Sequence, residues 1–267
     1  MTHRTTAGTE LDIRLLGRFA VRTVDGREIN LAGRHSQALF TLLALARRPR
    51  TREAIGADLW PESVVTVTLR QALYQLRGAI VAAGVAIDQV IEADAETIGL
   101  RPSAVHSLDV DLFDACAADP ACGAETAVAM YGGDLAEGLG HDCFAAERER
   151  LADRYEDALA NCAARRLESG DIDGARAAAE RLISRDPLRE EAHEVLISVH
   201  GMTGSRSQVI RRYLRLCDIL ARELGELPLP ETVATYRWAI ARTVARSRER
   251  AAGLERRTNS RLAIVQA

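Results

Sequence analysis

Positions 64–80 read VVTVTLRQALYQLRGAI and have the pattern of a helix with two contrasting faces. Its apolar residues recur at steps of four, three and four, which places on one buried stripe Leu69, Leu73, Leu76 and Ile80. The opposite side carries Gln71, Tyr74 and Gln75, with Thr68 nearby and Arg70 and Arg77 at its flanks. This outward face has no carboxylate, amides can pair bidentately with adenine, and arginines can hold phosphates or guanine. The stretch predicts a helix that reads the DNA major groove; taken alone, an ordinary amphipathic helix with a solvated polar face stays open.

The order of elements around this helix favours a winged helix. Alternation predicts a strand over 11–22, followed by a turn at 24–27 and a short returning strand at 28–31. Helices are predicted over 34–46 and 51–59, the second with Thr51 as its N-cap. Two strand-like runs, 86–92 and 97–101, follow the opening helix and are joined by 93–96. Strands, three helices and a terminal hairpin describe a winged helix with the third helix as reader and the hairpin as wing.

From Leu108 onward the pattern predicts helices alone. They are expected over 145–168, 172–185, 188–202 and 207–224 and from Pro230 past Arg246, with Gly or Pro at the breaks. Such a series indicates a helical repeat array, and the spacing of Gly170 and Gly204, 34 residues apart, favours the tetratricopeptide type. The predicted fold is therefore an α+β N-terminal winged helix followed by an all-α tetratricopeptide-like repeat domain. The expected boundaries are a disordered N-terminus at 1–10, the winged helix at 11–105, the repeats at 106–240 and a basic extension at 241–267.

The charge of the chain is unevenly distributed. All 35 basic residues are arginine, which we attribute to coding bias, and the formal net charge is −3. Residues 1–105 hold 13 arginines and 11 acidic residues, whereas the remainder holds 22 and 27. A modestly basic N-terminal half is compatible with DNA, and the acidic C-terminal half argues against a protein that coats nucleic acid along its whole length. The arginine-rich segment 242–261 is interpreted as a solvated helix, with a secondary DNA or polymerase contact as the alternative.

No pattern of metal ligands or cofactor binding is present in the sequence. The five cysteines form no CxxC pair and are expected to be reduced, and His141 and Cys143 lack a second pair with metal-site spacing. The N-terminus has no apolar core and no run of about 18 apolar residues exists, so we expect a soluble, cytoplasmic protein without membrane contact. We predict no metal and no cofactor.

Motifs in both halves resemble the antibiotic regulatory proteins of streptomycetes. ADLWP at 57–61, LRQALYQLR at 69–77 and LDVDLF at 108–113 are similar to the winged helix and junction of that family. YGGDLAEG at 131–138, RDPLREEAH at 185–193 and RELG at 222–225 are similar to its bacterial transcriptional activator domain. The resemblance covers about residues 11–240, in the family's order.

The resemblance implies a transcription activator that binds direct repeats in double-stranded promoter DNA and recruits RNA polymerase, including its sigma factor. Family members often control a secondary-metabolite gene cluster, and direct repeats imply a possible homodimer. Mapped onto this chain, the base-reading residues are Thr68, Gln71, Tyr74 and Gln75, and the residues for phosphate or guanine are Arg34, Arg50, Arg52, Arg70 and Arg77. The wing departs from a groove-entering wing because it carries Glu92, Asp94 and Glu96. We therefore expect its tip to stay out of the minor groove, where it could instead touch sigma factor or a neighbouring protomer.

The sequence leaves two alternative functions. A signalling adaptor would use its repeats to bind a protein and its N-terminal fold to dimerise; it predicts that Arg70, Gln71 and Gln75 tolerate substitution. An enzyme is disfavoured because GxSxG, HExxH and Walker motifs are missing and the six histidines form no i, i+4 pair. We expect neither an ATPase nor a receiver domain, so control would act through abundance, a ligand or partner of the repeats, or oligomerisation.

Overall fold

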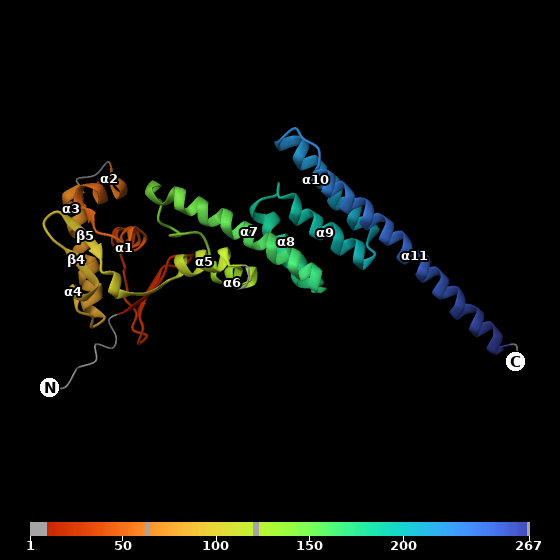
Figure 1. Ribbon diagram of the computed structural model, residues 1–267, viewed down its shortest axis with the longest axis horizontal. Helices are drawn as coiled ribbons and strands as arrows, with labels where there is room; N and C mark the ends of the chain where they lie inside the picture. Colours follow the sequence, from red (N-terminus) through yellow and green to blue (C-terminus); the bar gives the residue numbers. More distant parts are fainter. Residues whose placement is uncertain (1–9, 62–64, 120–122, 266–267) are drawn as a thin grey trace. The chain divides into compact units, whose positions relative to one another are not determined.

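The computed structural model describes residues 10–61, 65–119 and 123–265, and of positions 62–66 and 250–265 it gives at most the backbone (Figure 1). The chain divides into two compact units, residues 1–155 and residues 156–267. Most of the predicted disordered N-terminus, residues 1–9, lies outside the described residues. Among the described residues, no helix is both long enough and apolar enough to cross a membrane.

A small sheet of order β2-β1-β6 opens the first unit. β1 (Leu11–Arg14) pairs antiparallel with β2 (Ala20–Thr23) and parallel with β6 (Val105–Leu108). The prediction of one strand over 11–22 was wrong, because the chain turns between β1 and β2 at Gly17, whose φ is +84°. The predicted returning strand at 28–31 is reduced to an isolated bridge between Arg22 and Glu28. β6 was not predicted.

Three helices follow as predicted. α1 (Arg34–Ala46), α2 (Arg52–Leu59) and α3 (Val65–Ala82) pack on one another through buried side chains that include Leu39, Ile55 and Leu76. The Thr51 cap is confirmed, since the backbone N–H of Ala54 donates to Thr51 Oγ1 at 3.2 Å. α1 ends in the left-handed conformation at Arg47, whose φ is 54°.

The wing is a hairpin of β4 (Ile91–Ala93) and β5 (Thr97–Leu100), extended by β3 (Arg50–Thr51) to the order β3-β5-β4. A strand over 86–92 was too long a prediction. Its first part is the short helix α4 (Ile87–Val90), and its strand begins at Ile91. The order of sheet and helices in this region is nevertheless that of the predicted winged helix.

α5 (Asp109–Ala118) and α6 (Ala124–Met130) complete the first unit with the start of α7 (Ala145–Ser169) and the short 3-10 turns η1 (Pro102–Ala104) and η2 (Asp142–Phe144). Tyr131 is fully buried and stacks on Tyr155 of α7 at a ring-centroid distance of 4.1 Å, with Phe113 of α5 beside it. Asp109 accepts backbone N–H bonds from Leu15 and Leu16 at 2.9 Å. This carboxylate therefore fastens α5 to the chain that leaves β1, as a structural group.

The second unit is helical where it is described. α8 (Ile172–Arg185), α9 (Glu190–Thr203), α10 (Arg206–Glu223) and α11 (Pro230–Val265) lie within two residues of the predicted limits that were given. α9 packs against α8, α10 and α11, and the core includes Ile197, Val209 and Ala239. Gly170 and Gly204 have φ values of +83° and +80°, the left-handed conformation that ends a helix.

The oxidation state of the cysteines differs from the prediction. Cys143, Cys162 and Cys217 are free thiols as predicted, but Cys116 is disulfide-bonded, and Cys122 lies outside the described residues. The prediction of five reduced thiols was wrong because the sequence spacing from which it was drawn does not fix which thiols meet in space.

Candidate nucleic-acid interface

α3 has the two faces that its sequence predicts. The buried stripe consists of Leu69, Ala72, Leu73, Leu76 and Ile80, none more than 6% exposed. The opposite side exposes Arg70, Gln71, Tyr74, Gln75 and Arg77, and Tyr74 projects furthest, with 78% of its surface exposed. Thr68 is half-buried and already has an interaction partner within the protein. The predicted residues of α3 thus share one side of the helix, with Thr68 at its edge.

The exposed side also contains residues that the sequence interpretation did not single out. Val67 and Val81 are 61% and 59% exposed, and Gly78 lies between Tyr74 and Val81 on the same stripe. The 3.6-residue period that identified Gln71 and Tyr74 also places these three residues outward. An apolar side chain on a reading helix can contact the methyl group of thymine.

A groove of about 860 Å³ runs along one flank of α3, between α2, α3 and the turn of the wing. Its charged lining consists of Arg52, Arg70 and Arg77, with Glu53 as the acidic member. Arg70 and Arg77 form no ion pair with another residue in the described parts of the chain. The groove therefore brings together three of the five arginines predicted to bind phosphate or guanine.

The other predicted arginines differ from one another. Arg34 is exposed at the start of α1. Next to it, a side chain at Gly33 would come within 2.6 Å of Gln75 Oε1, so Gln75 lies against the beginning of α1. Arg50 is half-buried and forms an ion pair with Asp58 at 2.6 Å. Any phosphate bound by Arg50 would share its guanidinium with this carboxylate, and the role of Arg50 stays a prediction.

The acidic residues of the wing serve the hairpin itself. Asp94 accepts backbone N–H bonds from Thr97 at 2.6 Å and from Glu96 at 2.8 Å, and these bonds lower the pKa of its carboxyl. The guanidinium of Arg52 donates to the Asp94 carbonyl oxygen at 2.8 Å, and Glu92 lies 3.9 Å from Arg101. The tip of the wing is a tight turn that is hydrogen-bonded to Arg52 at the start of α2. This contact limits how far the tip can extend toward a DNA groove.

Residues outside the reading surface connect α2 to α1 and to η2. The indole N–H of Trp60 donates to His35 Nδ1 at 2.8 Å, which ties the end of α2 to α1. η2 packs against α2, and burial together with the carboxylate of Asp58 raises the pKa of the Cys143 thiol to about 11. Cys143 is therefore a packing residue and not a reactive thiolate. Among the described residues, no cluster of His, Cys, Asp or Glu is suited to a metal ion.

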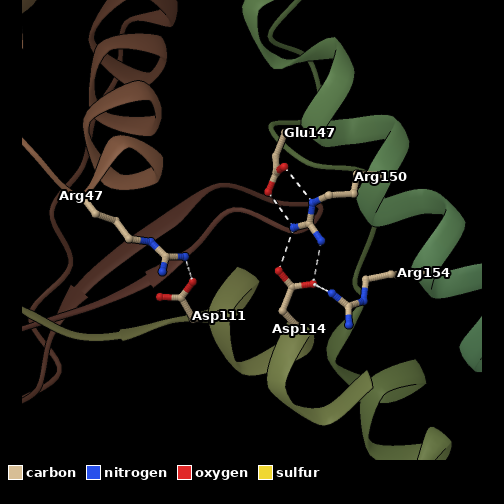
Figure 2. Close-up of polar contacts among 6 residues, drawn as sticks. All are labelled: Arg47, Asp111, Asp114, Glu147, Arg150 and Arg154. Carbon is tan, nitrogen blue, oxygen red and sulfur yellow. Dashed lines mark hydrogen bonds and ion pairs between the residues drawn. The ribbon is translucent and has the colours of Figure 1, made fainter. Parts of the chain in front are cut away.

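Ion pairs connect the end of α1 to α5, and α5 to α7 (Figure 2). Arg47, at the end of α1, pairs with Asp111 of α5. Three residues further along α5, Asp114 accepts from Arg150 at 2.7 Å and from Arg154 at 3.2 Å, while Glu147 also binds Arg150. α5 therefore connects the end of α1 to α7 through carboxylates on two of its turns.

Comparison with known proteins identifies the helical part. Residues 114–239 match the family model of the bacterial transcriptional activator domain. The chain carries a bacterial transcriptional activator domain. This family consists of transcriptional regulators and not of enzymes, which agrees with the expectation from the sequence. No curated protein matches the sequence.

The fold of most of the chain is similar to that of a solved structure, Mycobacterium tuberculosis EmbR in complex with a low affinity phosphopeptide. The TM-score is 0.67 and the identity 23%, and the match covers 90% of this chain and 66% of that one. At this identity the likeness shows the fold alone. Together with the activator domain it confirms the predicted architecture, a winged helix followed by a tetratricopeptide-like domain.

Proposed function

We propose that this chain is a sequence-specific transcription activator. Its winged helix binds direct repeats in promoter DNA, as a homodimer on paired sites, and its activator domain recruits RNA polymerase with its sigma factor. Its targets are the genes of a secondary-metabolite or other pathway cluster, and it acts in the cytoplasm, at the nucleoid. The observation that carries the proposal is the outward face of α3.

That face carries side chains that can contact both the bases and the phosphates of a duplex. Gln71 and Gln75 are exposed amides that can pair bidentately with adenine, and Tyr74 stands between them. Arg70 and Arg77 line the adjoining groove without an internal carboxylate partner among the described residues. Unpartnered guanidinium groups beside exposed amides match a duplex, in which phosphates flank base edges.

Arg52 and the domain boundaries complete the proposal. Arg52 is near the N-terminus of α2, where backbone N–H groups favour an anion, and it lines the same groove. A phosphate bound there would extend the contact from the reading helix to α2. For the domains, we propose winged helix at 11–105, activator domain at 106–240 and basic extension at 241–267. The division of the chain into two compact units falls later, at 155/156; β6 pairs with β1, and α5 contacts both strands.

The decisive experiment is fluorescence anisotropy with duplexes selected from a random pool, against scrambled duplexes, over a series of salt concentrations. We expect selective binding and a linear fall of log K with log salt, whose slope counts the phosphate contacts. The double variant Gln71→Ala, Gln75→Ala should bind selected and scrambled DNA alike. Arg211→Ala, which removes an exposed charge from α10, is the matched control and should behave as wild type.

Two outcomes would reject the proposal in different ways. If no selected duplex is preferred over scrambled DNA at any salt concentration, the adaptor function becomes the better explanation, and a protein partner of the repeats should be sought. If selection succeeds but the double variant keeps its preference, DNA binding stands and α3 is not the reader.

A further inference from the structure

Gly78 occupies the crest of the outward face of α3. It lies one turn after Tyr74 and is exposed, and α3 continues to Ala82, so Gly78 is in the interior of the helix and not at its cap. A side chain built at Gly78 would meet no atom of the protein within 4 Å. The crest therefore has a notch, which we define as the gap at Gly78 between the exposed side chains of Tyr74 and Val81.

The fold gives no reason for glycine at this position. Glycine is less favourable than alanine within a helix because the unfolded chain loses more conformational freedom. Where this chain uses glycine for packing, the cause is visible: a side chain at Gly201 would lie 2.8 Å from Ala239 Cβ. At Gly78 the space is open and the φ is negative, so alanine would fit and would stabilise the helix.

We propose that the notch at Gly78 receives the wall of the DNA groove, so that the sugar-phosphate backbone or a base edge approaches the helix backbone there more closely than any side chain allows. The inference rests on the proposed function of α3 as the reading helix. Arg77 is the next residue along the chain and lines the adjoining groove, so a guanidinium is available for the phosphate that enters with this wall. Glycine is the residue used where another backbone must come close.

The notch predicts opposite effects of one substitution on stability and on binding. Gly78→Ala should raise the melting temperature by about 2–4 °C, because it adds helix propensity without a clash. The same variant should weaken binding to the selected duplex about fivefold or more, the loss expected when a contact of a reading helix is displaced. Gly78→Val should weaken binding further, because its side chain is larger.

Ala177→Gly is the control. Ala177 is exposed in the interior of α8, outside the proposed reading surface, and its replacement by glycine should lower the melting temperature while leaving DNA affinity unchanged. Gly78→Ala and this control together separate the effect of helix stability from the effect of a close approach between DNA and the helix backbone.

Three results decide the inference. A more stable Gly78→Ala with weakened binding supports the notch. A more stable Gly78→Ala that binds the selected duplex as tightly as wild type overturns the notch but leaves α3 as the reader. Absence of selective binding by the wild type overturns the proposed function and the notch together.

Discussion

Arginines on two helices of the N-terminal unit are in opposite situations. On α7, Arg150 and Arg154 both donate to Asp114, and Arg150 also donates to Glu147. On α3, Arg70 and Arg77 are exposed and have no carboxylate partner within the described residues. The first pair satisfies its charge inside the fold and stabilises it, whereas the second is left for an anion from outside. The partners of an arginine, more than its presence, therefore indicate where a ligand binds.

Asp114→Ala should have the largest effect on stability. It leaves two half-buried guanidinium groups without their shared acceptor, and we expect a loss of about 1.5–3 kcal/mol, the range for hydrogen bonds to charged groups. Denaturant unfolding measures the change. Asp173→Ala is the control, since Asp173 is 95% exposed and its contact with Arg176 is 3.8 Å long. A loss no larger than that of the control would contradict a stabilising role for the α5–α7 ion pairs.

Gln75→Ala should change specificity more than stability. A bidentate contact to adenine is worth about 1–3 kcal/mol of discrimination. Because Gln75 is exposed and its side chain lies against Gly33, its replacement by alanine should change the free energy of unfolding by less than about 0.5 kcal/mol. Binding to duplexes with single substitutions at each position measures the discrimination. Unchanged discrimination at every position would remove Gln75 from the reading surface.

Arg70→Ala and Arg77→Ala should each weaken binding to all duplexes by a similar factor if they hold phosphates. Each should then reduce the slope of log K against log salt by about 0.9, the contribution of one phosphate contact. A variant that loses affinity for one sequence only would instead have lost a contact to guanine. Neither substitution should lower the melting temperature, and a drop as large as that of Asp114→Ala would mean that the arginine has an internal role.

The sequence predicted best those features that repeat along a helix. The limits of α8 to α11 and the buried and exposed sides of α3 follow from a 3.6-residue period with Gly or Pro at the ends. β6 and α4 are four residues long, too short to show a period, and β6 exists because it pairs with β1 about ninety residues earlier. Arg50 and Arg52 were predicted to hold phosphates because they lie near the start of a predicted helix. Sequence could not show that Asp58 and the Asp94 carbonyl engage them, since such contacts depend on tertiary structure.

His193 extends the comparison to a buried side chain with one unpartnered ring nitrogen. Its Nε2 lies 3.1 Å from the carbonyl oxygen of Pro187, while its Nδ1 has no hydrogen-bond partner among the described residues. Burial lowers the pKa of His193 below its usual 6.5, so the unfolded chain binds a proton more readily than the folded one. The stability that this histidine contributes is therefore present above pH 6.5 and is lost as the pH falls below that value.

His193→Gln should flatten the fall of the melting temperature between pH 7.5 and about pH 5.5 without abolishing it, because burial also lowers the pKa values of His141 and His200. If His193→Gln has the same pH dependence as wild type, the neutral buried imidazole is not a source of acid sensitivity.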